Sequence, residues 1–381
     1  MNTTPKSNRI HIGIFGNTNA GKSTLLNLLT DQESSLVSSV SGTTTDPVYK
    51  AMELPNIGPA IFIDTAGFND NSSLGIQRER KTLEVIEKID IGFIVIRDNN
   101  LKEEYIQKLK EKNKPLIAIF NDYENNKLKD YLKEKYNINS IIFDKENILS
   151  EIKILSENII TEIPLVDRLV KKNDIVLLVM PQDIQAPKGR LILPQVQTIR
   201  NLLDNKCIVL SVTQDNFLES LATLNKSPDL IITDSQIFKY VYENKPEDSL
   251  LTSFSVLFAA SKGDIYEYVK GASAIDSLNE NSKVLIAEAC THAPLEEDIG
   301  RVKIPKLLKQ KFGDLDIKHV RGNDFPNDLS KYDLVILCGS CMFNRSHVMN
   351  RINSAKNTNT PITNYGITIA HLNNILDKVV Y

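Results

Sequence analysis

The sequence predicts an α/β protein built from successive units with largely parallel sheets. Short apolar runs such as IHIGIFG, GFIVI and PLIAIF alternate with longer stretches of helical spacing, such as QRERKTLEVIEKI. Strands that alternate with helices form parallel sheets with helices on both faces. The alternation restarts at Pro164 and again after the polar segment NENSKV, so we expect units at residues 1–163, 164–278 and 279–381.

Composition and charge are those of an ordinary globular chain. Hydrophobic residues make up 41% and charged residues 24% of the 381 residues, and the net charge is −3. Because no basic block accompanies this balance, we expect no nucleic acid partner. The apolar runs are far shorter than a membrane span, and the first residues, MNTTPKSNR, lack the apolar stretch of a secretion signal. We therefore expect a cytoplasmic protein with no membrane partner, whose 4 cysteines are not structural disulfides.

A phosphate-binding loop follows the first apolar run. Residues 16–23 read GNTNAGKS, which matches G-x-x-x-x-G-K-S, and the helical stretch TLLNLLT comes next. A strand, a glycine-rich loop and a helix in this order form a P-loop, whose backbone N–H groups hold phosphate oxygens. Lys22 is expected to reach the β- and γ-phosphates, and Ser23 to bind Mg²⁺. The expected nucleotide-contacting residues of the loop are Gly16, Asn17, Asn19, Ala20, Gly21, Lys22, Ser23 and Thr24.

Two further motifs follow in the order that a nucleotide switch requires. The polar segment SSVSGTTTDP offers the hydroxyl of Thr44, which can complete the Mg²⁺ shell when a γ-phosphate is present. The buried run AIFIDTAGF contains Asp64, expected to hold Mg²⁺ directly or through water, and Gly67, whose N–H would contact the γ-phosphate. Segments of this kind order around a triphosphate and relax on hydrolysis. The expected catalytic set is therefore Lys22, Ser23, Thr44, Asp64 and Gly67.

Together these motifs resemble the translation-factor-like GTPases, in the branch that contains Era and the tRNA-modification GTPases. The resemblance implies a guanine-reading Asn-Lys-x-Asp after a later strand, where this chain reads Asn-Asp-Tyr-Glu at 121–124. Asn121 fits the motif, and Glu124 replaces the aspartate with one more methylene of reach. Asp122 stands where a lysine normally covers the base and braces the P-loop. We expect GTP rather than ATP, bound with weaker affinity and selectivity than usual.

The hydrolytic machinery of this domain is sparse. No glutamine directly follows DTAG to orient water, so we expect a slow intrinsic GTPase rate. In the tRNA-modification branch, the asparagine that matches Asn19 accompanies a potassium ion that substitutes for an arginine finger, and the resemblance thus implies K⁺. Asparagine is equally common in turns, which would make Asn19 a plain loop residue. Both interpretations stay open.

The second and third units carry the cysteines. In the second, DIVLLVM, CIVLSV and DLIIT alternate with the helical stretches LPQVQTIRNLLD and DNFLESLATL, and LTSFSVLFAASKGDIYEYVKGASAI reads as helices. Cys207 lies in an apolar run and is expected to be a small buried residue. In the third, the strand KVLIAEA leads to Cys290 and His292, and DLVIL leads to Cys338 and Cys341. Since the carboxyl ends of parallel strands share one edge, three thiolates can converge there.

Three kinds of site fit this spacing. One is zinc held by three cysteines with His292 as the fourth ligand. Another is a dithiol redox pair at Cys338 and Cys341, which leaves Cys290 unexplained. The third is an iron–sulfur cluster on three thiolates with a weaker or exchangeable fourth ligand. Spacing alone does not choose between them.

Nearly the whole chain resembles the HydF family of [FeFe]-hydrogenase maturation GTPases. The resemblance rests on Cys-Thr-His followed by DIGRVKIP, and on Cys-Gly-x-Cys-Met with Arg345 and Arg351 beyond. It extends to the middle segments APKGRLILPQVQTIR, PDLIITDSQIF and LTSFSVLFA. It implies a GTPase domain, a dimerisation domain and a cluster-binding domain, with a [4Fe–4S] cluster on Cys290, Cys338 and Cys341.

The chain departs from the family pattern at the fourth cluster ligand. The family usually has His-Cys-x-x-Cys, but here Leu337 stands before Cys338. His292, a carboxylate such as Asp183 and an exchangeable small ligand stay open as the fourth ligand. An open iron position suits a carrier, because incoming cargo displaces a weak ligand.

The resemblance implies a homodimeric scaffold or carrier. Such a protein receives a diiron precursor made by two radical SAM enzymes and passes it to apo-[FeFe]-hydrogenase, while the nucleotide domain times the exchange of partners. Two other functions stay open from the residues alone. One is an RNA- or ribosome-associated GTPase with a zinc-binding tail, and the other is an iron–sulfur electron-transfer module.

Overall fold

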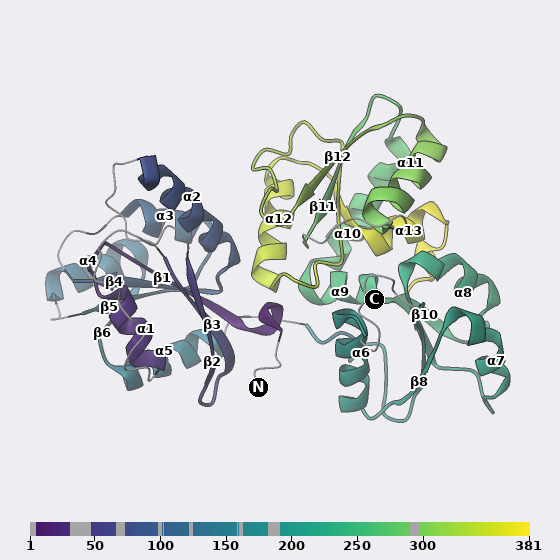
Figure 1. The fold of residues 1–381 in the computed structure, drawn as a ribbon, viewed down its shortest axis with the longest axis horizontal. Helices are drawn as coiled ribbons and strands as arrows, with labels where there is room; N and C mark the ends of the chain where they lie inside the picture. Colours follow the sequence, from purple (N-terminus) through teal and green to yellow (C-terminus); the bar gives the residue numbers. More distant parts are fainter. Residues whose placement is uncertain are drawn as a thin grey trace. The chain divides into compact units, whose positions relative to one another are not determined.

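The chain divides into two compact units, residues 1–161 and 162–381. A computed structural model describes residues 5–30, 47–65, 73–97, 101, 103–121, 125–157, 159, 163–181, 191–289 and 298–381. Figure 1 follows the chain through both units, from purple at the N-terminus to yellow at the C-terminus. Within these ranges, no helix is both long enough and apolar enough to cross a membrane.

The first unit is a six-stranded sheet with helices on both faces (Figure 1). Its strands are β1 (Ile10–Gly16), β2 (Val48–Leu54), β3 (Gly58–Asp64), β4 (Ile91–Ile96), β5 (Leu116–Phe120) and β6 (Asn139–Ile142). They lie in the order β2-β3-β1-β4-β5-β6, and all neighbours pair in parallel except β2, which runs antiparallel to β3. The central strands are continuous apolar runs because both faces of the sheet are covered, and every residue of β4 is buried.

Two layers of helices cover this sheet. They are α1 (Lys22–Thr30), α2 (Ser73–Lys88), α3 (Glu103–Glu111), α4 (Asn126–Tyr136) and α5 (Lys145–Glu157). Leu25 of α1 lies in the core on one face, and Ile86 of α2 lies in the core on the other. Local signals set the helix boundaries: at the start of α4, Asn125 Oδ1 accepts a hydrogen bond from the Leu128 N–H at 3.2 Å.

The second unit contains two four-stranded sheets. The first holds β7 (Ile175–Val179), β8 (Ile208–Val212), β9 (Leu230–Thr233) and β10 (Leu250–Ser253), in the order β10-β9-β7-β8. The second holds β11 (Lys283–Glu288), β12 (Asp316–Arg321), β13 (Leu334–Leu337) and β14 (Ile362–Asn364), in the order β12-β11-β13-β14. All pairs between these strands are parallel. The predicted class, a P-loop domain followed by further α/β units with largely parallel sheets, is confirmed.

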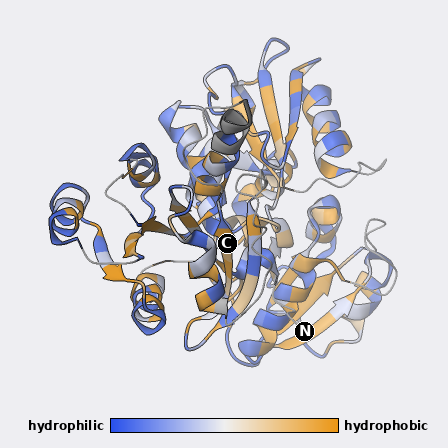
Figure 2. Ribbon diagram, turned by 60° about the vertical axis from the view of Figure 1, so that its left-hand side comes forward, coloured by the Kyte–Doolittle hydropathy of each residue, from blue (hydrophilic) through white to orange (hydrophobic). Residues whose placement is uncertain are grey.

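Helix α9 connects the two sheets of the second unit. The helices are α6 (Leu193–Asp204), α7 (Phe217–Ala222), α8 (Phe238–Asn244), α9 (Phe254–Lys262), α10 (Ile265–Ala272), α11 (Ile304–Phe312), α12 (Arg345–Asn357) and α13 (Tyr365–Leu372). Val256 of α9 lies in the large core with Leu177 of β7 and Ile286 of β11, whereas Phe254 lies in a smaller core with Leu202 of α6. Figure 2 shows the strands mostly in the hydrophobic colour, as this double burial requires.

Four strands differ from the expectation drawn from the sequence, and one of them is β6, which was not expected. Residues 251–253, expected to belong to a helix, end β10, and Ser253 then caps α9 by accepting from the Val256 N–H at 3.3 Å. β2 is an edge strand with a largely exposed face, and β14 has 3 residues, and neither was expected. Their periodicity is unreadable because short or exposed strands carry too few alternating apolar positions.

Gly271 determines how closely α10 packs on β14. A Cβ at this position would clash with the carbonyl oxygen of Ile362. We expect Gly271→Ala to destabilise the second unit by about 1–3 kcal/mol, because the added carbon has no room, although alanine has the better helix propensity. Urea unfolding followed by circular dichroism measures the change. Gly339→Ala is the matched control, since its Cβ would lie an ordinary 3.8 Å from Ser255 Oγ. Equal stability of the two variants would contradict this account.

Candidate functional site

The P-loop lies between the end of β1 and the start of α1, with its lysine folded into it. The Lys22 side chain is buried, and its Nζ donates to the carbonyl oxygens of Gly16 and Asn17 at 3.0 and 2.9 Å. Burial lowers the pKa of Lys22, and the Asp64 carboxylate opposes that shift. Anionic phosphate oxygens would be stronger partners for this ammonium than two neutral carbonyls.

Ser23 and Asp64 form a hydrogen-bonded pair beside the loop. Ser23 Oγ donates to Asp64 Oδ2 at 2.9 Å. The other carboxylate oxygen, Oδ1, is buried and accepts no hydrogen bond from the residues that the structure describes. Burial raises the pKa of Asp64, while Lys22 and the Ser23 hydroxyl oppose this shift. A hydroxyl beside an unsatisfied carboxylate oxygen suits Mg²⁺ and its bound waters.

Asn121 connects the end of β5 to the P-loop. Its Nδ2 donates to the Ala20 carbonyl at 2.9 Å. A Cβ at Gly21 would clash with this amide group, and Gly21 has φ of +101°, so a side chain there would be both crowded and strained. Asn121 therefore braces the P-loop, although Asp122 stands where the usual bracing lysine would be.

Asn19 adopts the left-handed backbone conformation that asparagine tolerates better than most residues. Its φ is 63°, its side chain is exposed, and its carbonyl accepts a hydrogen bond from Arg97 Nη1 at 3.3 Å. The turn alone accounts for asparagine at this position. The potassium site stays a prediction.

Several predicted site residues lie outside the described part of the chain. They are Thr44, Gly67, Glu124, Asp183, Cys290 and His292. The γ-phosphate contacts, the second half of the guanine motif, the third thiolate and the fourth cluster ligand therefore stay predictions.

Strands β11 and β13 bring two cysteine-bearing segments to one edge of their sheet. The strands are parallel neighbours, with Ala287 opposite Leu337. The Cys338 N–H donates to the Ala287 carbonyl at 3.0 Å, and the Ala289 N–H donates to Cys338 Sγ at 3.1 Å. Ala289 immediately precedes Cys290 in the sequence, and Cys290 itself lies outside the described residues. The two strand ends meet as the sequence predicts.

The Cys-x-x-Cys segment forms a tight turn after β13. Ser340 has φ of 52°, and its N–H donates to Cys338 Sγ at 3.4 Å. Hydrogen bonds to sulfur tune the potential of thiolate-held clusters. Cys341 is partly buried, and this burial, reinforced by the neighbouring Cys338, raises the pKa of Cys341 to about 11. Without a bound metal ion, Cys341 keeps its proton at neutral pH, and a metal ion would favour the thiolate.

Two thiols alone do not make a metal centre. Among the residues that the structure describes, no three histidine, cysteine, aspartate or glutamate side chains are grouped so as to hold a metal ion. Cys207 is buried just before β8, with its Sγ donating to the Lys171 carbonyl at 3.6 Å. Its predicted role as a small buried residue is confirmed.

Sequence reasoning missed one residue beside the cysteines. Lys262, the last residue of α9, is 2% exposed, and its Nζ donates to the carbonyls of Cys341 and Phe343 at 3.2 and 2.8 Å. A lysine at a helix C-terminus usually indicates a solvated charge that complements the helix dipole. Because 79 residues separate Lys262 from Cys341, no local pattern signals the contact.

Family models divide the chain into three matched segments. Residues 11–122 match the model described as 50S ribosome-binding GTPase, which covers the P-loop, Asp64 and Asn121. Residues 165–263 match the hydrogen maturase F dimerization domain. Residues 266–381, which include Cys338 and Cys341, match the hydrogen maturase F tetramerization domain.

Curated relatives share only part of their length with this chain. The tRNA modification GTPase MnmE of Mesoplasma florum is 31% identical over 206 residues, which are 47% of this chain and 45% of that protein. The GTPase Der of Wolinella succinogenes is 42% identical over 90 residues, which are 23% and 19% of the two chains. The chain thus spans less than half the length of these relatives. A crystal structure of Era from Aquifex aeolicus bound to GDP·AlF4− has 19% sequence identity and a TM-score of 0.33, covering 63% of this chain and 99% of that one.

The order of the family models decides the family. The GTPase model is followed by the two hydrogen maturase F models, which leave few residues of the second unit unmatched. The first unit is therefore a GTPase domain, and the chain belongs to the hydrogen maturase F family.

Proposed function

We propose that the chain is a GTP-hydrolysing scaffold or carrier that binds a [4Fe–4S] cluster on Cys290, Cys338 and Cys341. In this proposal it accepts a diiron precursor from two radical SAM enzymes and delivers it to apo-[FeFe]-hydrogenase. Membership of the hydrogen maturase F family supports the proposal. The structural observation on which the cluster site rests is the 3.1 Å hydrogen bond from the Ala289 N–H to Cys338 Sγ, which places the residue before Cys290 against the second cysteine segment.

The residues at this edge of the sheet suit an iron–sulfur cluster. Cys338 and Cys341 are partly buried thiols on one turn, and soft thiolates are the usual ligands of iron–sulfur clusters. The Lys262 ammonium, bonded to the Cys341 carbonyl, adds positive charge that offsets the negative charge of several thiolates. A bound cluster would supply an iron position open to exchange. His292, Asp183 or a small exchangeable molecule is proposed as the ligand of that position.

The first unit is proposed to bind Mg²⁺–GTP and to hydrolyse it slowly. Lys22 would exchange its two loop carbonyls for phosphate oxygens. Ser23 and Asp64 would bind Mg²⁺, directly or through water, where their hydrogen bond now lies. Thr44 is proposed to complete the Mg²⁺ shell, and the Gly67 N–H to contact the γ-phosphate.

Guanine selection is proposed for Asn121 and Glu124. The hydrogen bond from Asn121 Nδ2 to the Ala20 carbonyl fixes the base-reading segment to the phosphate-binding loop, so the two ends of the nucleotide would be held by one connected frame. A K⁺ ion at Asn19 is proposed to stabilise the charge that develops during hydrolysis, as the resemblance to the tRNA-modification branch implies.

A homodimer is proposed to form through the second unit. The family models for this unit are described as dimerization and tetramerization domains. β8 is an edge strand on which Ile208 is 51% exposed, and on α6 Val196 and Leu203 are 47% and 56% exposed. Exposed apolar side chains on an edge strand and on a helix are typical of an interface between chains.

Anaerobic iron and sulfide analysis tests the cluster directly. For the reconstituted protein we expect about four irons per chain and, after reduction, the EPR signal of a [4Fe–4S] cluster. Cys338→Ala should lose that signal because one of three thiolates is gone. Cys207→Ala is the matched control and should keep it, since Cys207 is bonded to the Lys171 carbonyl. Stoichiometric zinc without EPR-active iron would overturn the proposal in favour of a zinc-tailed GTPase.

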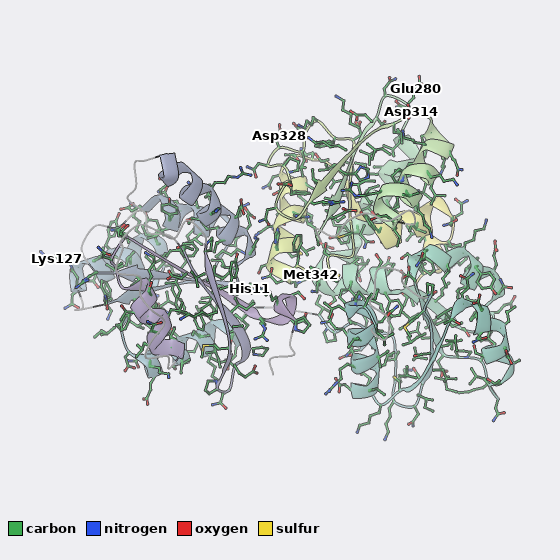
Figure 3. The ribbon with its side chains drawn as sticks, viewed as in Figure 1. His11, Lys127, Glu280, Asp314, Asp328 and Met342 are labelled. Atoms are coloured by element: carbon green, nitrogen blue, oxygen red, sulfur yellow. The ribbon has the colours of Figure 1, made fainter. Side chains whose placement is uncertain are left out.

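Lys22→Ala should abolish GTP hydrolysis and leave cluster assembly intact. The reason is chemical: the cysteines all lie at or beyond Cys207, whereas the residues proposed to bind phosphate, those of the P-loop and Gly67, all precede them in the first unit. Phosphate release and iron content, measured on the same preparation, check the expectation. The exposed Lys127, labelled in Figure 3, provides the control variant Lys127→Ala, which should keep both activities. Loss of both properties in Lys22→Ala alone would show that the two sites are not separable.

Mg²⁺-dependent GTP binding should weaken as the pH falls, starting at a higher pH than an ordinary aspartate would allow. Burial raises the pKa of Asp64, so its carboxylate is protonated, and lost as a ligand, earlier on acidification. Titrations with a fluorescent GTP analogue between about pH 5 and pH 8, with and without Mg²⁺, measure this effect. Asp64→Asn should bind Mg²⁺ more weakly, and its GTP binding should not show this loss on acidification. If the wild-type protein and Asp64→Asn show the same pH dependence of GTP binding, the loss at low pH comes from a group other than Asp64.

A further inference from the structure

Lys262 connects the end of α9 to the turn that carries Cys341. Its ammonium is held by the Cys341 and Phe343 carbonyls at 3.2 and 2.8 Å and lies 5.8 Å from the centre of the Phe258 ring. Removing an ammonium from water is costly unless it is well hydrogen-bonded. A methionine would fill the same space without that cost, so what the lysine adds is its hold on two backbone carbonyls.

Arg345 makes the reciprocal contact. As the first residue of α12, it donates from Nη1 to the carbonyls of Ser261 and Gly263 at 3.0 and 2.7 Å. These carbonyls lie at the C-terminus of α9, where a helix leaves its last acceptors without intrahelical donors. Lys262 therefore binds the backbone before α12, and Arg345 binds the backbone around Lys262. We call this reciprocal pair, Lys262 and Arg345, the clamp.

The far side of the turn is fixed by stacking. The Phe343 and His347 rings are stacked with centroids 4.0 Å apart, and the Arg351 guanidinium carbon lies 4.6 Å from the Phe343 centroid. Met342, labelled in Figure 3, is 55% exposed. The outer side of the turn thus faces solvent, whereas Cys341 packs against the core that contains Phe254, and its carbonyl accepts from Lys262.

Ile163, which belongs to the start of the second unit and which we call the linker, contacts the same place. The Ile163 N–H donates to the Ser261 carbonyl at 3.3 Å, and Ser261 Oγ donates back to the Ile163 carbonyl. The Ser261 carbonyl thus accepts from both the linker and Arg345. One short stretch, residues 261–263, is bonded to the linker on one side and to the Cys341 turn on the other.

We propose that Lys262 is the positioning residue of Cys341, and that the clamp carries displacements of the linker at Ile163 to the Cys341 turn. The inference rests on the proposed role of Cys341 as a metal ligand and deepens it, because it assigns how that ligand is held and how it is moved. With the clamp closed, the Cys341 and Phe343 carbonyls point at the ammonium and the sulfur stays partly buried. With it open, the turn loses these bonds and keeps its connection to β13, the hydrogen bond from the Ala289 N–H to Cys338 Sγ and the Phe343 stack.

Amide hydrogen exchange of the segment 338–344, followed by mass spectrometry in full-length, reduced, iron-free protein, tests the clamp. This measurement reports opening of the turn and does not depend on the ionisation of the thiols. Lys262→Met and Arg345→Met should each raise the exchange of this segment by roughly tenfold or more, the factor that about 1.4 kcal/mol of lost charged hydrogen bonding gives.

The matched control is Lys245→Met. Lys245 Nζ also donates to backbone carbonyls, those of Pro246, Glu247 and Ser249, but far along the chain from the cysteines. The Lys245→Met variant should leave the hydrogen-exchange rate of the 338–344 segment at its wild-type value. Wild-type exchange in folded Lys262→Met or Arg345→Met would overturn the clamp. If Lys262→Met fails to fold, Arg345→Met decides, because its side chain is only partly buried.

Ser261→Ala tests the link to the linker. Loss of the hydroxyl bond to Ile163 should raise exchange of the 338–344 segment, and wild-type exchange there would overturn the transmission from the linker. These outcomes are independent of the proposed function, because the protein is free of iron. Absence of a cluster from the wild-type protein would instead sink the proposed function, whatever the exchange shows.

Discussion

Parallel strand pairing is the constraint on which both sites depend. In a parallel sheet the carboxyl ends of all strands lie along one edge, so residues that follow different strands meet although they are distant in sequence. Asp64 ends β3 and Asn121 follows β5, and both contact the loop after β1. In the second unit the same rule joins Ala289 after β11 to Cys338 after β13. The pairing of the parallel strands therefore determines which side chains lie together at the edge of each sheet, and so which residues can form a site.

Each site carries charge that burial makes unfavourable and that a ligand of the opposite sign would stabilise. Burial lowers the pKa of Lys22 and raises the pKa of Asp64, so both ions are less stable there than in water, despite their mutual attraction. Phosphate would favour the ammonium, and Mg²⁺ the carboxylate. Cys341 is the analogous case, because its raised pKa disfavours a thiolate until a metal cation binds. In both units, folding has already removed these groups from water, so a ligand of opposite charge would bind them without that additional desolvation cost.

Motifs formed by neighbouring residues could be predicted from the sequence. Contacts between segments that are distant in the sequence could be predicted only where a general rule of protein structure brings those segments together. The P-loop and the strand–helix alternation gave the fold class, and the parallel-sheet rule gave the meeting of the strand ends at Cys338. Neither approach finds Lys262, because its partner Cys341 is 79 residues away and a lysine at a helix end normally faces solvent. β14 was missed for another reason, since 3 residues show no periodicity.

Any coupling between the proposed nucleotide site and the proposed cluster site would have to be mechanical, because the two sites would use different ligand types on different units. α9 is suited to transmit movement because it lies in both cores of the second unit: Val256 packs in one and Phe254 in the other. Close-packed cores shift between discrete arrangements and do not absorb displacement by gradual compression. A shift at Ser261 would therefore move Lys262, and with it the carbonyls of the Cys341 turn. In the proposed clamp, Lys262 would thus be the residue through which movement at Ile163 reaches the Cys341 turn.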